Sequence, residues 1–563
     1  MGERRLYAFP VAIAAYPALF LASQFPLNAG LDELAIVVLA FGAAAAAVYA
    51  ATFAVLRRRA GAGVIALVTT AIVGFLFCGQ MVADRVPFMR QRATLALLAA
   101  LAAIVSAWLV LRRRPARTVV RTVGLFAYFL LLSAATHFWL AKGRADRTAE
   151  RASAAVGFDR PIPLASGEGR RRPDIWLLIV DGMANEPTIE AFKGGSNRRF
   201  VDSLRALGFA LPAVWSNYPW TAQSLSSLLN VADVNGIRRN IPRGVSQDGV
   251  YFRLVQSGRV PRTLAAAGYS IYLESSVGFG GSHRLDAPFR RLGPRGADRV
   301  RAAFGVHTLG AAAVQATLPG RVLAMRGRSL AWPEVQLRQF DDVRRAIGEP
   351  GPKFVLLHTL LTHDPFMLDR SCRARRVPAP PDSAGSAYVE HVHCASGKLT
   401  QLVTEILRRS PEPPVILIQG DHGSWPAGLT TSQPAASLRE AELTERYGAF
   451  GAYYLPDGGA RAIPPVMSPV NVLRLVLGQY LGANLPLLPN ASYYAPRDAL
   501  TPFTDVDTLP FARFHERWAN AERPDVAKHG ADAPDARDVS RAAPPAQRGA
   551  SQVRMGETGT ARP

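Results

Sequence analysis

Cysteine is scarce in this sequence, with only three residues among 563. So few cysteines exclude a framework of several disulfides of the kind that holds small secreted domains together. Cys78 lies within a long apolar run, which leaves Cys372 and Cys394 as one candidate pair. A bond between them is permitted outside the cytoplasm, and closing that loop would contribute about 3 kcal/mol. The sequence alone leaves the pairing open.

Acidic residues are outnumbered, since 43 Asp and Glu stand against 65 Lys and Arg and the formal net charge is +22. So basic a chain could bind nucleic acid, but it carries no helix-turn-helix, zinc-finger or RNA-binding signature. Clusters of arginine flank its apolar segments instead, which favours contact with anionic lipid headgroups. We therefore expect a membrane partner and no nucleic-acid partner.

The N-terminal part contains five long apolar runs, each near the roughly 20 residues that a helix needs to cross the hydrocarbon core. They cover residues 6–25, 34–56, 62–83, 94–111 and 119–141. Charged segments separate the runs, and since a central arginine costs about 2.5–3.5 kcal/mol on insertion, these segments must be loops. The sequence predicts a five-helix transmembrane domain over residues 1–143.

The loop at residues 26–33 lacks both lysine and arginine. Three arginine-rich segments, at residues 4–5, 57–59 and 112–117, lie on the opposite side if the runs alternate, although the outer loop at 84–92 also carries arginine. By the positive-inside rule the N-terminus is cytoplasmic, and an odd number of spans exports the rest of the chain. A cleaved signal peptide is the less favoured alternative for the first run. We expect a multi-pass protein of a bacterial cytoplasmic (inner) membrane, with its large domain on the periplasmic face.

The exported part divides by composition into three segments. Residues 144–172 are rich in Arg, Ala and Gly without apolar periodicity and predict a basic linker along the membrane surface. Residues 173–511 alternate helical patterns with short apolar runs at 175–181, 354–360 and 415–421, which are typical of buried parallel strands. We expect an α/β domain with a mostly parallel sheet covered by helices on both faces. The tail at 512–563 has no hydrophobic pattern and should be disordered.

A hydroxyl follows the Pro-Trp turn in "NYPWTAQSLSSLLN", residues 217–230. Thr221 could be only a helix N-cap, whose side-chain oxygen accepts from free backbone N–H groups. A hydroxyl there would also lie at the positive end of the helix dipole, where an alkoxide or a phosphoryl group is stabilised. Distant residues must decide between these two interpretations.

Three predicted strands end in residue types that bind metals. Asp181 ends the first, His363 follows the second, and Asp421 and His422 follow the third. In open α/β sheets, sites form beyond the carboxyl ends of the strands, so these side chains should meet at one edge. Each motif alone is more often a surface turn, but with Thr221 they form a set that suits one divalent ion, Zn²⁺ or Mn²⁺. Such an ion should also help to ionise the threonine hydroxyl.

Four motifs occur in a fixed order at large spacings: "PDIWLLIVDG", "SNYPWTAQSLSSLLN", "LLHTLLTHDPF" and "VILIQGDHGSW". In these motifs the chain resembles the alkaline phosphatase superfamily, in its sulfatase-like hydrolase/transferase branch, over about residues 173–492. Membrane spans followed by an exported domain also resemble, in architecture, the phosphoethanolamine transferases and lipoteichoic acid synthases.

The resemblance implies a role for each matching residue. Asp181, Asp421 and His422 match metal ligands of that family, and Thr221 matches the nucleophile that also touches the metal. His363 matches the histidine that contacts the substrate or protonates the leaving group.

Three nearby residues are further candidates for substrate binding. His358 lies in the same motif as His363, Asn217 could offer an amide to a non-bridging oxygen, and Trp220 could shape the turn or the pocket wall.

The chain also departs from the family pattern. Classical sulfatases convert a Cys or Ser in a C/S-x-P-x-R motif, and neither that residue nor the arginine stands in the stretch at 221–225. Asp181-Gly182 replaces the paired aspartates of calcium-dependent sulfatases, which disfavours calcium and sulfate-ester cleavage. Asp181 also stands where phosphoethanolamine transferases have a glutamate, which leaves the donor open.

These features predict a membrane-anchored, metal-dependent transferase. It would move a phosphoryl-type group, such as phosphoethanolamine or phosphoglycerol, through a covalent ester of Thr221 to a cell-envelope acceptor. Membrane lipids and cell-surface glycans are the expected substrates. One alternative is a phosphatase, phosphodiesterase or atypical sulfatase that transfers only to water. A second is a non-catalytic membrane scaffold with a degenerate hydrolase domain.

Overall fold

The fold was analysed in a computed structural model of the full chain. The structure describes residues 8–24, 26, 30–85, 91–112, 117–165, 171–243, 245–275, 289–292, 296–304, 309–325, 332–375, 379, 384–497, 502–506, 511 and 513–514. The tail predicted at 512–563 lies outside the described residues except for 513 and 514.

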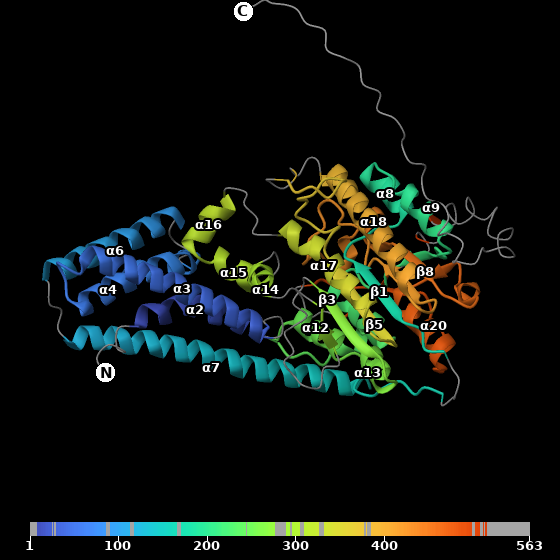
Figure 1. The fold of residues 1–563 in the computed structure, drawn as a ribbon, viewed down its shortest axis with the longest axis horizontal. Coiled ribbons are helices and arrows are strands. Elements are labelled where there is room, and N and C mark those ends of the chain that lie inside the picture. Colours follow the sequence, from blue (N-terminus) through green and yellow to red (C-terminus); the bar gives the residue numbers. More distant parts are fainter. Residues whose placement is uncertain are drawn as a thin grey trace, which may run out of the picture.

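A group of apolar helices forms the N-terminal part, drawn in blue to cyan in Figure 1. They are α2 (Phe9–Gln24), α3 (Leu31–Leu56), α4 (Ala62–Val73), the π-helical turn η1 (Gly74–Cys78), α5 (Gly79–Ala83), α6 (Gln91–Arg112) and α7 (Arg117–Ala155). Four segments of the described chain are long and apolar enough to cross a membrane, at Leu31–Leu56, Ala62–Ala83, Thr94–Leu111 and within Arg117–Ala155. The first predicted span, α2, has 16 described residues and is shorter than the others. The count of five spans stays a prediction.

A six-stranded sheet in the order β4-β3-β5-β1-β6-β8 forms the centre of the second part. Its strands are β4 (Phe289–Arg291), β3 (Ser270–Ser275), β5 (Lys353–Thr359), β1 (Ile175–Val180), β6 (Val415–Gln419) and β8 (Gly451–Tyr454). All neighbours pair in parallel except β6 and β8. The predicted runs at 175–181, 354–360 and 415–421 are therefore β1, β5 and β6, and β1 lies between the other two in the sheet.

Helices cover both faces of this sheet (Figure 1). Alternate side chains of β1 point to opposite cores, because successive residues of a strand face opposite ways. Ile175, Leu177 and Ile179 join a core that includes residues of α10 (Thr221–Asn230), α12 (Gln247–Gln256), α13 (Arg259–Ala266) and α20 (Pro469–Leu481). Trp176, Leu178 and Val180 join a core with residues of α8 (Glu186–Lys193), α9 (Arg198–Ala206), α17 (Trp332–Ile347) and α18 (Ala384–Arg409). The predicted fold class is confirmed.

Shorter elements complete the described chain. They are β2 (Ala213–Trp215), α11 (Asn235–Arg238), α14 (Ala297–Ala303), α15 (Leu309–Gln315), α16 (Leu318–Met325), η3 (Ala435–Ser437), α19 (Glu440–Tyr447), β7 (Gly448–Ala449), η4 (Gly459–Ala462), β9 (Val466–Met467), β10 (Ser492–Tyr494) and β11 (Thr504–Val506). β7, β2 and β9 form a small sheet, and β10 pairs with β11.

Helix α7 continues into the segment predicted as a linker. It runs for 39 residues to Ala155 and joins the two parts of the molecule (Figure 1). Ala145, Ala149 and Ala152 are buried in the core of the α/β domain. They recur at spacings of three and four residues, so they share one helix face. Residues 144–155 of the predicted linker are therefore helical, and a stripe of small residues packs them against the domain.

A second connection comes from α14 to α16, within the segment predicted as one catalytic domain. Ala313 of α15 is buried in a cluster with apolar residues of α2 and α3. Arg299 forms an ion pair with Asp32 (2.5 Å), and the backbone N–H of Leu309 donates to the Glu33 carboxylate (2.5 Å). The N-terminal turn of α3, which contains Asp32 and Glu33, therefore lies on the same side as the α/β domain.

Candidate functional site

The first strand of the site ends in a sharp turn. Asp181 follows β1, is almost fully buried and donates its backbone N–H to the Thr359 carbonyl of β5 (2.9 Å). Gly182 has φ +71°, a conformation that residues with a side chain rarely adopt. Its N–H donates to the Asp421 carboxylate (2.9 Å), which ties the end of β1 to the end of β6.

The third strand delivers Asp421 and His422, both buried. A Cβ atom at Gly420 would lie 2.2 Å from the Met183 carbonyl, so only glycine lets the two strand ends approach this closely. Ser216 and Ser224 both donate to the backbone carbonyl of Asp421, at 2.7 and 2.6 Å. The position of Asp421 is therefore fixed from three sides.

Thr221 is the first residue of α10, and Trp220 is the N-cap. The capping interpretation of this hydroxyl is therefore wrong. Its Oγ1 lies 3.1 Å from Asp181 Oδ2 and 3.2 Å from His422 Nε2. The side chain is partly exposed, whereas the residues around it are buried. A carboxylate, an imidazole and a hydroxyl from three distant segments thus meet at the helix N-terminus.

The two histidines of the second motif lie in different surroundings. His358 is inside β5, fully buried, with Nε2 at 3.3 Å from Asp181 Oδ2. It therefore lies among the predicted metal ligands and not at the substrate side. His363 lies further out, partly exposed, where its Nδ1 contacts the carboxylate of Asp364 at 2.9 Å.

The two remaining candidates are structural. The Asn217 amide donates to the Ala491 carbonyl (2.8 Å) and its oxygen accepts from the Val470 N–H (3.0 Å). This side chain thus fastens the chain segment before Thr221, and its contact with a substrate stays a prediction. Trp220 is buried, donates to the Ala495 carbonyl (2.8 Å) and forms a wall of the site.

Arg446, at the end of α19, was missed by the sequence reasoning. Its buried guanidinium contacts His422 Nε2 (3.0 Å), donates to the Pro219 carbonyl (2.8 Å) and lies over the rings of Trp220 and Trp425, at 5.3 and 4.7 Å from their centroids. Nothing in "LTERYGAF" distinguishes this arginine from a surface residue, because its partners lie far away in the sequence.

The pKa values of the site residues are shifted in both directions by burial and by neighbouring charges. Burial, followed by the charge of Asp181, raises the pKa of Asp421 to about 7. Burial would also raise the pKa of Asp181, but a hydrogen bond from His358 and neighbouring charges hold it well below its usual value. Burial lowers the pKa of Arg446 to about 10, so it stays cationic at neutral pH. Burial lowers the pKa of His363 too, but Asp364 and Asp181 outweigh it and raise that pKa to about 9.

The residues fit a bound cation. Asp181, His358 and Asp421 offer ligand atoms that all lie within 4.8 Å of one another. Oδ1 of Asp181 and Oδ2 of Asp421 receive no hydrogen bond from any described residue, although both are buried. Buried carboxylate oxygens are normally paired or coordinate a metal. Two carboxylates with imidazole nitrogens form a mixed oxygen and nitrogen set that suits a divalent ion such as Zn²⁺ or Mn²⁺.

Comparisons with known proteins find similarity only among solved structures. No protein-family model matches the chain, and no curated protein matches it. One match is the C-terminal periplasmic domain of EcEptC from Escherichia coli, at 13% identity and TM-score 0.38, over 63% of this chain and 99% of that one.

Two other matches cover different shares of this chain. The integral membrane lipooligosaccharide phosphoethanolamine transferase A from Neisseria meningitidis matches at 14% identity and TM-score 0.33, over 85% of this chain and 96% of that one. The phosphonate monoester hydrolase of Agrobacterium radiobacter matches at 12% identity and TM-score 0.35, over 57% and 80% of the two chains. Proteins of the kind expected from the sequence are thus among the matches, and the chemistry below is argued from this chain's own residues.

Proposed function

We propose that this chain is a membrane-anchored transferase that moves a phosphoryl-type group through a covalent ester of Thr221. The observation that carries the proposal is the position of the partly exposed Thr221 Oγ1, within 3.2 Å of both Asp181 and His422, at a helix N-terminus. This hydroxyl is partly accessible to solvent, and it contacts both a carboxylate and an imidazole.

Asp181, Asp421 and His422 would hold one divalent ion, with His358 as a fourth candidate ligand. Such an ion, when bound, lowers the pKa of a hydroxyl beside it and offsets negative charge on a phosphoryl oxygen. Metal content can be measured directly on the purified full-length protein.

The chain's own residues then carry the two displacements. In the first, Thr221 Oγ loses its proton to solvent and bonds to phosphorus, the bond from phosphorus to the leaving oxygen breaks, and His363 gives that leaving oxygen a proton. In the second, the acceptor hydroxyl gives its proton to His363 and bonds to phosphorus, while the bond to Thr221 Oγ breaks. The raised pKa of His363 supports its role as the acid of the first step.

Arg446 supplies fixed positive charge where the phosphoryl oxygens would lie. It contacts His422 and donates a hydrogen bond to the carbonyl of Pro219, two residues before Thr221. Donors that are aimed in advance at developing charge stabilise a transition state without reorganisation. The N-terminus of α10 adds its partial positive charge at the same point.

The membrane helices favour a lipid as donor. A headgroup such as phosphoethanolamine or phosphoglycerol would reach the periplasmic domain at the membrane surface, and a cell-envelope glycan would be the acceptor. The ion pair of Arg299 with Asp32 supports this arrangement, because it keeps the domain beside the membrane helices.

The proposal is tested with the purified protein in vesicles that contain headgroup-labelled phosphatidylethanolamine or phosphatidylglycerol. We expect label on the protein, and its later transfer to an added glycan. Label released only to water would instead identify a phosphodiesterase, and no consumption of either lipid together with no bound metal would identify a scaffold.

A further inference from the structure

A cavity of about 730 Å³ lies between the start of α9, the middle of α18 and the loop at residues 370–371. None of its lining residues belongs to the catalytic centre described above. The volume falls in the range of sites that hold small ligands, roughly 300–1,000 Å³.

Three arginines line this cavity, namely Arg198, Arg199 and Arg370. Arg198 lies 3.5 Å from the Glu190 carboxylate, and among the described residues no carboxylate pairs with Arg199 or Arg370. Guanidinium groups bind phosphate with two parallel hydrogen bonds and keep their charge at every physiological pH. The cavity therefore favours a phosphate-bearing ligand.

Asn197 anchors the start of α9 beneath the cavity. It is one of the lining residues, yet it is only 4% exposed. Its Oδ1 accepts from Ser396 Oγ of α18 (3.0 Å) and its backbone N–H donates to Glu186 of α8 (2.6 Å). Arg198 and Arg199 therefore follow a fixed point of the chain.

The remaining lining is mostly hydroxyl. Ser203, Ser371 and Thr400 add alcohol groups, and Phe200 adds a ring. The hydroxyls of Ser203 and Thr400 donate to the backbone carbonyls of Arg199 (2.7 Å) and Ser396 (2.9 Å), so they offer a ligand their acceptor lone pairs. Such acceptors suit the hydroxyls of a sugar better than an acyl chain. The lining as a whole therefore combines anion binding with polyol binding.

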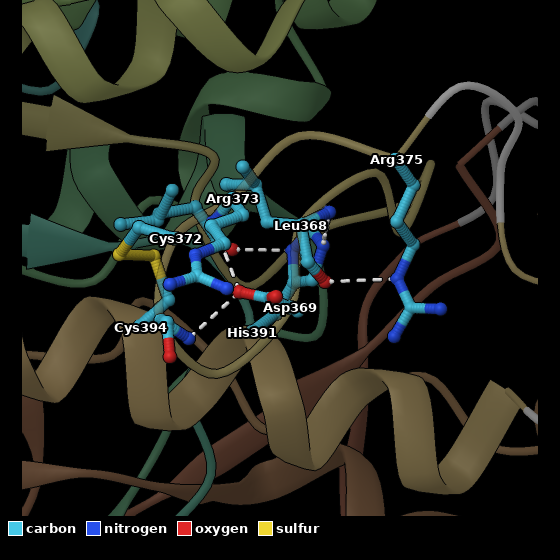
Figure 2. Close-up of a disulfide and its surroundings, with 9 residues drawn as sticks. Leu368, Asp369, Cys372, Arg373, Arg375, His391 and Cys394 are labelled. Carbon is cyan, nitrogen blue, oxygen red and sulfur yellow. Dashed lines mark hydrogen bonds between the residues drawn. A yellow bond between two sulfur atoms is a disulfide. The ribbon is translucent and has the colours of Figure 1, made fainter. Parts of the chain in front are cut away.

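The wall that carries Arg370 is fixed in place. Cys372 and Cys394 form a disulfide, which resolves the pairing that the sequence left open and fastens the loop to α18 (Figure 2). The Asp369 carboxylate accepts from the N–H groups of Ser371 (2.8 Å) and Arg373 (2.9 Å). The site is therefore preorganised, and a ligand need not order this loop.

We propose that this cavity binds a phosphate-bearing saccharide as a second site, in addition to the catalytic centre. Tyr388, on the same helix α18, donates to the carbonyl of Gly182 beside Asp181 (2.9 Å). His393 lines the cavity and lies five residues further along the same helix, which corresponds to a rise of about 7.5 Å. The second site thus holds a phosphorylated glycan close to the centre without using its residues.

The test uses the full-length protein in nanodiscs and glucose 1-phosphate as the probe, with glucose and inorganic phosphate for comparison, by isothermal titration calorimetry. We expect Arg199→Ala/Arg370→Ala to weaken glucose 1-phosphate binding at least tenfold, and glucose or phosphate alone to bind at least tenfold more weakly. Arg205→Ala is the matched control, because Arg205 lies on α9 outside the cavity and pairs with Asp202. It should change the Kd less than twofold.

Unchanged binding in the double variant would overturn the proposal, as would equal binding of phosphate and the sugar phosphate. Thr221→Ala separates the two sites, because loss of glucose 1-phosphate binding in that variant would assign the binding to the catalytic centre and also overturn the proposal. Cys372→Ser/Cys394→Ser gives a second variant, for which we expect weaker binding through a loosened wall. Label on Thr221 is measured separately, so failure of the transferase proposal is distinguishable from failure of this one.

Discussion

The hydroxyls of α10 differ in what their oxygens contact. Ser224, Ser226 and Ser227 all donate to backbone carbonyls at 2.6–2.9 Å, which is the usual way to satisfy a buried hydroxyl. Thr221 instead contacts a carboxylate and an imidazole, and it is partly exposed. Thr221 thus differs from these three serines in contacting ionisable side chains, which supports its proposed role as the nucleophile.

Thr221→Ser keeps an attacking oxygen, whereas Thr221→Val keeps the shape without it. We expect the serine variant to retain measurable transfer and the valine variant to lose about 10³-fold or more, since it lacks the nucleophile. Initial rates of lipid headgroup release provide the measurement. Equal rates in the valine variant and the wild type would remove Thr221 from the mechanism.

Arg446 should act on the rate more than on binding. Arg446→Ala removes a preorganised cation, and we expect kcat to fall about 10²–10³-fold with a smaller change in KM. Arg446→Lys should recover part of the loss, because the charge is kept but the forked donor set is not. The exposed Arg461 provides the control, and Arg461→Ala should match wild type. A change in KM alone would assign Arg446 to ground-state binding.

Asp421→Asn tests the metal site without a change of volume. The wild-type chain should bind about one equivalent of metal after dialysis, and the variant should lose most of it, because a charged ligand has been removed. Elemental analysis by inductively coupled plasma mass spectrometry gives the ratio. Full metal content in the variant would contradict the assignment of Asp421.

At the scale of elements, the loop after β5 is fastened to α18 by one histidine. His391 is fully buried, its Nδ1 contacts the Leu361 carbonyl (2.8 Å), and its Nε2 accepts from the Leu368 N–H (2.8 Å). These contacts require the neutral ring, with its proton on Nδ1. Burial lowers the pKa of His391 to about 4.

Acidification should therefore loosen this loop. The unfolded pKa is about 6.5, so the opened loop binds a proton that the closed loop does not, and stability is lost as the pH falls below about 6.5. Between pH 7.5 and pH 5 the expected loss is about 2 kcal/mol of local stability. Hydrogen exchange of the 361–375 amides, corrected for intrinsic rates, measures it. His391→Gln should flatten the pH dependence, and an unchanged pH dependence in that variant would exclude His391.

Short apolar runs were sufficient to predict β1, β5 and β6 and hence the edge where Asp181, Asp421 and His422 meet. The strand β3 at Ser270–Ser275 was missed, because its run is interrupted by polar residues at both ends. Arg446 and the position of His358 against Asp181 could not be predicted, since both depend on packing between distant segments. A sequence pattern therefore predicts where strands end, but not which side chains from distant segments pack against those ends.

At the scale of the whole molecule, two contacts join the membrane helices to the α/β domain. One is α7, where Asp146 lies 3.6 Å from Lys142 and 3.7 Å from Arg253 of α12. The other is the docking of α14 and α15 onto the first turn of α3. The sequence predicted a linker here because alanine gives a weak apolar signal, which becomes visible only against its packing partner.

Glu33→Ala should release α15, since the Glu33 carboxylate accepts from two N–H groups at its start. We expect faster hydrogen exchange over residues 309–315 in nanodiscs. Asp146→Ala is the matched control, because it removes a carboxylate from the other connection and should leave α15 unchanged. Equal exchange in Glu33→Ala and wild type would show that this contact does not hold α15 in place.

The central claim is that Thr221 is the covalent nucleophile of a phosphoryl-type transfer. Tandem mass spectrometry of the quenched, digested protein, after brief exposure to phosphatidylethanolamine and phosphatidylglycerol vesicles, tests it most directly. We predict a headgroup phosphate on Thr221 itself, absent after chelation of the metal. Turnover of the lipid with no modified Thr221 peptide, or with the phosphate on another residue, would contradict the account.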